Sequence, residues 1–263
     1  MPVVRNIAKQ RLAEGRLVLG LGLRQARTVD IGMIARSCGF DYLFLDCEHN
    51  AMDLGVAADI SVAALGQGVT PIVRVPGKEP FHSVRVLDNG AQGVVVPHVD
   101  SAEEARAIAA NLRYPPAGHR SISRASPLVG FDTVPLEDFM REANDETLVV
   151  VMLESPAAIA QAGAIAAVPG IDVLLIGTND LCAEMGIHGQ FGHERVAEAY
   201  AEMIRACRVH GKHAGMAGVR EDELMQRYIG MGARFILAGV DLPLMMEAGK
   251  ARTKFLRGVE AGL

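Results

Sequence analysis

The chain has 263 residues, a formal net charge of −5 and 50% hydrophobic residues, enough for the core of one α/β barrel or of two small domains. The acidic balance, the lack of tryptophan and an aromatic content of only 5% argue against a nucleic-acid-binding protein. No apolar run approaches the ~18 residues of a membrane span. The N-terminal segment lacks the apolar core of a signal peptide, so a cytoplasmic protein is expected.

Apolar runs alternate with helical patterns from one end of the chain to the other. The runs that predict strands are 17–23, 42–46, 70–75, 93–97, 147–154, 172–177, 213–216 and 235–240. The main helical stretches are 28–38, 53–65, 80–88, 101–112, 136–143 and 193–210, and an amphipathic helix over 242–256 follows the last strand. Eight strands alternating with helices predict a single (β/α)8 TIM barrel over residues 1–263. An open doubly wound sheet is the alternative, but no GxGxxG motif follows the first strand.

Two acidic residues mark the ends of neighbouring predicted strands in the stretch 149–180. Glu154 ends one all-apolar run and Asp180 follows the next. A parallel crossover places the carboxyl ends of both strands on the same side of the sheet, so the two carboxylates can meet. Two converging carboxylates with room for water suit a hard divalent cation such as Mg²⁺. The alternative is that each acid only marks the start of a helix.

Other polar residues lie at the predicted carboxyl ends of strands, where barrel enzymes carry their chemistry. Together with the two acids above, this rim set is Asp46, Glu48, His49, Arg74, His98, Glu154, Asp180 and Asp241. A purely structural barrel has no need of so many charges at one rim, because burying unpaired charges costs several kcal/mol each.

His49 and Arg74 are the candidates for direct roles in catalysis. His49 follows two acids on a loop and suits a general base near neutral pH, although a histidine packed in a loop is the alternative. Arg74 lies in an otherwise apolar strand and needs an anionic partner. That partner is either Glu48, in a structural ion pair, or the carboxylate or developing enolate of a substrate.

Asp88 ends a predicted helix, where a carboxylate opposes the helix dipole and calls for a compensating partner. Two roles remain open for Asp88: either it orients His49, or it forms a simple hydrogen bond within its loop. The backbone of Gly177, Thr178 and Asn179 can offer N–H groups to a carboxylate at a helix start. None of the five lysines lies at the carboxyl end of a predicted strand, so enolate chemistry here would use a metal rather than a Schiff base.

Six segments together resemble the HpcH/HpaI family of metal-dependent pyruvate aldolases, which is related to citrate lyase β subunits, and the resemblance runs from about residue 17 to residue 241. They are FDYLFLDCEHN, PIVRVPG, RVLDNGAQGVVVPHVDSAEEARA, RYPPAGHRS, VMLESPAAI and GTNDLCAEMGIHGQFGHERV. The resemblance implies a (β/α)8 barrel, often with an exchanged last helix, assembled into homotrimers or homohexamers. It also implies reversible cleavage of 4-hydroxy-2-oxo acids to pyruvate, or a related 2-oxo acid, and an aldehyde.

The resemblance further implies roles for individual residues. It places Mg²⁺, Mn²⁺ or Co²⁺ on Glu154 and Asp180, the base on His49, its orienting partner on Asp88 and enolate stabilisation on Arg74, with Asp46 and Glu48 as supporting acids. The small-molecule 2-oxo acid and aldehyde would be the only partners besides other copies of the chain.

The chain departs from the family pattern at two points. Met152 stands where many members have glutamine, and GTND stands where many read GPxD. Two other functions remain as alternatives. One is an acyl-CoA lyase of the citryl- or malyl-CoA type, which shares the barrel and the acidic pair but has no need of His49. The other is a non-catalytic binding barrel, against which the intact rim residues argue.

Overall fold

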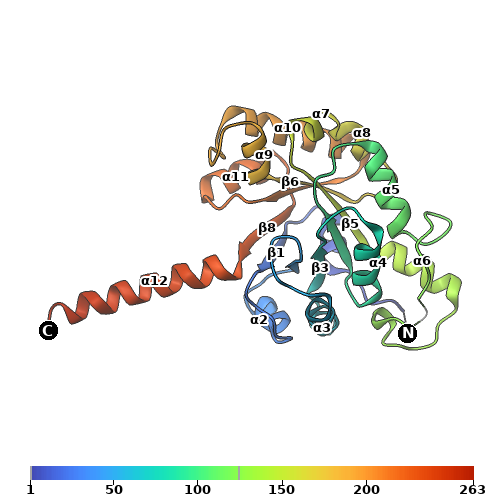
Figure 1. Ribbon diagram of the computed structural model, residues 1–263, viewed down its shortest axis with the longest axis horizontal. Coiled ribbons are helices and arrows are strands. Elements are labelled where there is room, and N and C mark those ends of the chain that lie inside the picture. Colours follow the sequence, from blue (N-terminus) through green and yellow to red (C-terminus); the bar gives the residue numbers. More distant parts are fainter. Residues whose placement is uncertain (1, 124) are drawn as a thin grey trace.

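The computed structural model describes residues 2–123 and 125–263, and its centre is a closed barrel of eight parallel strands in sequential order (Figure 1). The strands are β1 Val18–Leu23, β2 Tyr42–Asp46, β3 Thr70–Arg74, β4 Gly93–Val96, β5 Leu148–Leu153, β6 Val173–Gly177, β7 His213–Ala217 and β8 Phe235–Val240. Pairing of β1 with β8 closes the barrel. The predicted TIM barrel is therefore confirmed, and the eight strands agree with the predicted ones to within a residue or two at each end.

Helices connect the strands around the barrel, and helices also precede the first strand and follow the last. They are α1 Ile7–Ala13, α2 Ile31–Ser37, α3 Leu54–Leu65, α4 Pro80–Asp88, α5 Ala102–Leu112, α6 Leu136–Glu146, α7 Pro156–Ala160, α8 Ala162–Ala166, α9 Thr178–Glu184, α10 Glu194–His210, α11 Asp222–Met231 and α12 Asp241–Glu260, with a 3-10 turn, η1, at Pro127–Val129. The side chains of Asp53 and Ser101 cap α3 and α5. None of the helices described is both long and apolar enough to cross a membrane.

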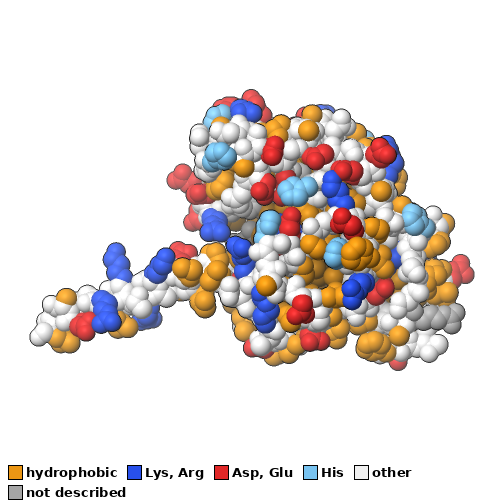
Figure 2. Space-filling view, viewed as in Figure 1, with side chains coloured by type: hydrophobic (Ala, Val, Ile, Leu, Met, Phe, Trp, Pro, Cys, Tyr) orange, Lys and Arg blue, Asp and Glu red, His pale blue; other side chains and the backbone are white. Residues whose placement is uncertain are grey.

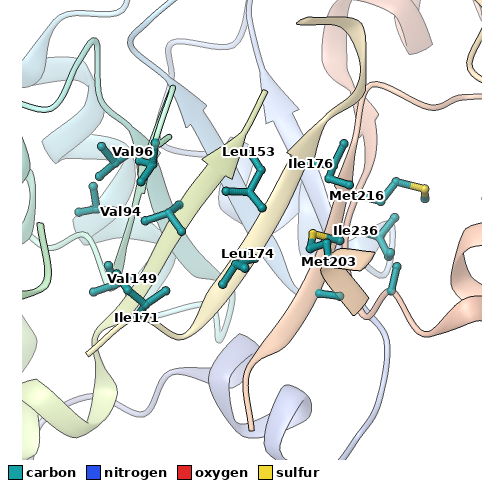
Figure 3. Packing of buried hydrophobic residues seen from close by; sticks show 14 of the residues in the cluster. Val94, Val96, Val149, Leu153, Ile171, Leu174, Ile176, Met203, Met216 and Ile236 are labelled. Atoms are coloured by element: carbon teal, nitrogen blue, oxygen red, sulfur yellow. The ribbon is translucent and has the colours of Figure 1, made fainter. Parts of the chain in front are cut away.

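Strand alternation divides the core into two layers. Inward side chains, including Phe44, Ile72 and Met152, fill the barrel together with residues of α1, which covers the amino ends of the strands. Outward side chains pack under the helices, and Figure 3 shows part of this layer, including Leu174 and Ile176. Side chains alternate between the two faces of each strand. The polar residues at the carboxyl ends of β2, β3 and β5 therefore point into the mouth of the barrel.

Helix α12 leaves the barrel and projects away from it (Figure 1). It contains no buried residue, and six of its large apolar side chains are exposed: Leu244, Met245, Met246, Phe255, Leu256 and Val259. Their exposed fractions lie between 44% and 62%. The helix extends beyond the predicted range of 242–256 at both ends, and a single protomer leaves its apolar face uncovered.

Candidate active site

Arg74 and Asp46 form a two-pronged ion pair inside the mouth of the barrel. The two residues are partners in the register between β2 and β3. Arg74 Nε donates to Asp46 Oδ1 at 3.0 Å and Nη2 donates to Oδ2 at 2.8 Å, while only 9% of the arginine is exposed. A bidentate pair of this kind fixes the plane of the guanidinium. The arginine thus has its main partner in Asp46, in addition to the Glu48 contact that the sequence suggested.

Asp46 also holds the loop that follows β2. Its Oδ1 accepts hydrogen bonds from the backbone N–H groups of Glu48 at 3.2 Å and His49 at 3.3 Å. Burial acts to raise the pKa of Asp46, but the hydrogen bonds and charge of Arg74, together with the two amides, outweigh it and lower that pKa below its usual value. Asp46 is therefore ionised at neutral pH and positions both the arginine and the loop.

Glu48 connects the arginine with two histidines. Its Oε2 lies 3.0 Å from Arg74 Nη1 and 3.7 Å from His49 Nε2, and its Oε1 lies 3.5 Å from His98 Nε2. Among the described residues, Oε2 is buried without a hydrogen bond of good geometry. The His49 side chain is 51% exposed. The imidazole therefore combines contact with a buried acid on one side with access to the cavity on the other.

Glu154 is the most deeply buried acid of the site, with 3% exposure. Its Oε2 accepts the backbone N–H of His98 at 2.8 Å and lies 3.4 Å from His98 Nδ1. The side chain lies against Gly177, where an added Cβ would come within 2.5 Å of Glu154 Oε1. Burial, followed by the charges of Asp180 and Glu48, raises the pKa of Glu154 to about 7 against the opposing effect of His98.

The surroundings of Glu154 fit a divalent cation. Burial is the main cause of its raised pKa, and the negative charges of Asp180 and Glu48 add to it, so a bound cation would offset negative charge that is concentrated here. Within residues 2–123 and 125–263, no three His, Cys, Asp or Glu side chains form a closed metal-binding set. Mg²⁺ and similar ions bind through one or two carboxylates and keep positions for water and substrate. Glu154 and Asp180 are the two carboxylates that could hold a cation in this open manner.

A cavity of about 970 Å³ opens at the carboxyl ends of the strands. Asp46, His49, Arg74 and Asp180 line one part of it, and it extends from there toward α12. Figure 2 shows basic, acidic and histidine side chains gathered on the barrel face near the point where α12 leaves it. The volume is that of a small-molecule site, with charged groups concentrated on one wall.

Gly177, Thr178 and Asn179 line the cavity at the start of α9. The Thr178 hydroxyl is buried and already bonded to the carbonyl of Ala217 at 2.7 Å and to the Tyr200 hydroxyl at 2.8 Å. The threonine side chain is thereby engaged in the fold. What this segment can offer to a substrate is its backbone and the exposed side chain of Asn179.

The structure does not bring Asp88 to His49 within the described protomer. Instead, Arg120 Nη2 donates to Asp88 Oδ1 at 2.6 Å, and the guanidinium of Arg120 lies 4.5 Å from the centre of the Tyr114 ring. Arg120 is thus the compensating partner that an acid at the end of α4 was expected to have. The sequence left two roles open for Asp88. In this protomer Asp88 has the local role, in which it pairs with Arg120.

His98 also belongs to the site. The sequence indicated only that this residue follows a predicted strand. It contacts Glu154 through its backbone and through its ring, and its φ of 52° is rare for a residue other than glycine. A left-handed residue at the end of β4 directs its N–H at the buried carboxylate. Such an unusual backbone conformation at a site residue cannot be identified from residue type.

Comparisons with known proteins agree with this geometry. The family model described as HpcH/HpaI aldolase/citrate lyase matches residues 23–248, and the chain belongs to this family. It is 39% identical over 250 residues to a 4-hydroxy-4-methyl-2-oxoglutarate aldolase of Hapsidospora irregularis, covering 93% of this chain and 92% of that one. It is 36% identical to a 4-hydroxy-2-oxovalerate aldolase of Rhodococcus jostii, covering 94% of each chain.

A solved structure of similar shape is an HpcH/HpaI aldolase from Desulfitobacterium hafniense. It superimposes with a TM-score of 0.90 at 30% identity and covers 95% of this chain and 96% of that one. The barrel, the order of its strands and the family resemblance of the six sequence segments are therefore consistent with one another.

Proposed function

We propose that this chain is a class II aldolase that reversibly cleaves 4-hydroxy-2-oxo acids to pyruvate, or a related 2-oxo acid, and an aldehyde. The observation that carries the proposal is the arrangement of the rim: His49, the half-buried Asp180 and the guanidinium of Arg74 line one cavity, and the buried carboxylate of Glu154 interacts with the charge of Asp180. Several relatives of similar length, at 34–39% identity, are aldolases for substrates of this class.

In the cleavage direction, His49 accepts the proton of the substrate's 4-hydroxyl group. The C3–C4 bond breaks, its electron pair passes into an enolate of the 2-oxo acid, and C4 becomes the carbonyl carbon of the aldehyde. Arg74 stabilises the negative charge that develops on the enolate oxygen, and Asp46 keeps the guanidinium in place for that role. Protonation of the enolate at C3 completes the formation of pyruvate.

Glu154 and Asp180 would hold the divalent cation, Mg²⁺, Mn²⁺ or Co²⁺. When bound, the cation acts as a Lewis acid toward the 2-oxo acid. The backbone of Gly177–Asn179 would bind the substrate carboxylate. The residue at 152 is a methionine whose Sδ lies 4.0 Å from Arg74 Nη1, so this wall of the site is less polar than a glutamine would make it.

An acyl-CoA lyase is the competing function within the same barrel. It has no need of a base at position 49, whereas His49 here reaches the cavity beside Glu48 and Arg74. Incubation of the purified protein with pyruvate and a panel of aldehydes, with Mn²⁺ or with EDTA, tests the proposal. Aldol products formed only with the metal support it. Turnover of acyl-CoA thioesters without any aldol product would favour the competing function.

Replacing Arg74 by lysine should lower the rate of aldol cleavage roughly 10²- to 10³-fold, the effect of losing one charge-stabilising donor. A lysine keeps the charge but cannot present the planar set of donors that contacts both Asp46 and Glu48. Pyruvate release measures the rate. Arg36→Lys, at an exposed residue of α2 whose side chain donates to the Gln67 carbonyl, is the matched control. A near-normal rate in Arg74→Lys would show that Arg74 acts only as a member of a structural ion pair.

The exposed apolar face of α12 leads us to propose that this helix packs on a neighbouring subunit of a homotrimer or homohexamer, in keeping with the family resemblance. Light scattering at micromolar concentration should give three or six times the protomer mass of 28.0 kDa. The double substitution Phe255→Glu and Leu256→Glu should produce smaller species. Val209→Glu, at a 67%-exposed residue of α10, should not. A stable wild-type monomer would contradict the proposal.

A further inference from the structure

Arg24 places a guanidinium at the cavity wall beside the proposed base. It follows β1 directly and lines the cavity, and its Nη2 lies 3.4 Å from the backbone carbonyl oxygen of His49. The side chain is therefore next to the loop whose imidazole would act on the 4-hydroxyl group. In an aldol substrate, the carbon that bears this hydroxyl also bears the substituent that leaves with the aldehyde.

The position of Arg24 is fixed by the end of β8. One carboxylate, Asp241, accepts the backbone N–H groups of Arg24, Gln25 and Ala26, each at 2.8 Å. On the other side, the side-chain amide of Asn50 donates to the carbonyl of Leu23 at 3.0 Å. The loop after β1 is thereby tied both to β8 and to the loop after β2, so Arg24 projects from a preorganised backbone.

The cationic charge of Arg24 has no acidic partner in the part of the chain that the structure describes: its guanidinium has no carboxylate within ion-pair distance, and the same holds for Arg220, a second cation in the cavity wall. Asp222 and Glu247 also line the cavity but form no ion pair with either arginine. By contrast, the charge of Arg74 is balanced by ion pairs with Asp46 and Glu48. The two uncompensated arginines are therefore available to an anionic group of a ligand.

We propose that Arg24, with Arg220 as a second cation, binds a carboxylate on the aldehyde half of the substrate, so that the enzyme prefers 4-hydroxy-2-oxo diacids over monoacids. The proposal rests on the proposed aldolase function and assigns the substrate class within it. Binding such a carboxylate would hold C4 beside His49 while the 2-oxo acid end lies toward Glu154 and Asp180.

Two substrates that differ only at C5 test the proposal. These are 4-hydroxy-2-oxopentanedioate, which yields glyoxylate, and 4-hydroxy-2-oxopentanoate, which yields acetaldehyde; both release pyruvate, which gives kcat and KM. The wild-type kcat/KM should be at least about 10-fold higher for the diacid. Arg24→Gln should lower the diacid value by about 10-fold or more, mainly through KM, and the monoacid value by less than about 3-fold.

The variants separate the possible outcomes. Arg24→Lys should recover part of the diacid preference because the positive charge returns. Arg16→Gln is the control, since Arg16 pairs with Glu14 on the segment that precedes β1, away from the cavity. Equal losses on both substrates in Arg24→Gln would show that Arg24 only supports the His49 loop, and they would overturn the proposal, as would an unchanged preference. A wild-type protein that cleaves neither substrate with Mn²⁺ present would instead overturn the aldolase function itself.

Discussion

Replacing Glu154 by glutamine should abolish metal-dependent aldol cleavage and stabilise the metal-free protein at pH 8. The amide is a neutral and much weaker ligand for a hard cation, so the acid pair with Asp180 is lost. At the same time, the substitution removes a negative charge that is 3% exposed and lies among other acids. The ionised form of Glu154, which is the form that binds the cation, therefore lowers the stability of the metal-free protein.

The pH dependence follows from the raised pKa of Glu154. Its pKa in the folded protein is about 7, above the ordinary 4.5, so between these values the folded state binds more protons than the unfolded state. Stability of the metal-free wild type should therefore fall as pH rises from about 4.5 to 7 and stay low above that. The stabilisation gained by Glu154→Gln should be small near pH 5 and reach a few kcal/mol at pH 8.

Thermal unfolding in EDTA at pH 5 and pH 8 measures this difference, and repeating it with Mn²⁺ measures metal binding without using activity. The wild type should gain stability from Mn²⁺ at pH 8, and the variant should not. Glu198→Gln, at an exposed acid of α10, is the matched control and should change neither quantity. If Glu154→Gln keeps metal-dependent activity or the shift in unfolding temperature with Mn²⁺, the metal assignment is wrong.

Replacing His49 by alanine should lower the rate of aldol cleavage by roughly two to four decades, the usual contribution of a positioned base. It should lower oxaloacetate decarboxylation far less, because forming the same enolate from oxaloacetate involves no hydroxyl deprotonation. The imidazole is 51% exposed toward the cavity and lies 3.7 Å from Glu48, so its removal leaves the Asp46–Arg74 pair in place. The two reactions therefore separate the base from the binding of metal and substrate.

Both rates should be measured across pH with saturating Mn²⁺, so that protonation of Glu154 does not limit metal binding. A base must be neutral to accept a proton, so the wild-type cleavage rate should decline on the acidic side along one ionisation. That decline should disappear in His49→Ala and persist in His188→Ala, a control at an exposed loop histidine. Equal losses in the rates of cleavage and decarboxylation would show that His49 is not the base. The base would then be a water held by Glu48.

The sequence predicted the barrel because each layer of the fold repeats one local pattern. Buried strands of a parallel sheet need near-continuous apolar runs, and amphipathic stretches between them need a helical period, so eight alternations are visible without a structure. The same logic identified Glu154 and Asp180, since parallel strands bring their carboxyl ends to one rim. Alternation along β2 and β3 likewise turned Asp46 and Arg74 into the barrel mouth.

What only the tertiary structure decided is which charges meet. Sequence left the partner of Arg74 open, and the register of β2 with β3 made it Asp46. Asp88 pairs with Arg120, 32 residues further along the chain. A left-handed backbone brings the N–H of His98 to Glu154. Asp241, which lies 217 residues from Arg24, holds the backbone of Arg24 at the cavity wall. The physical reason is that local patterns fix period and burial, whereas pairing between charges depends on strand register and on loops brought together only when the barrel closes.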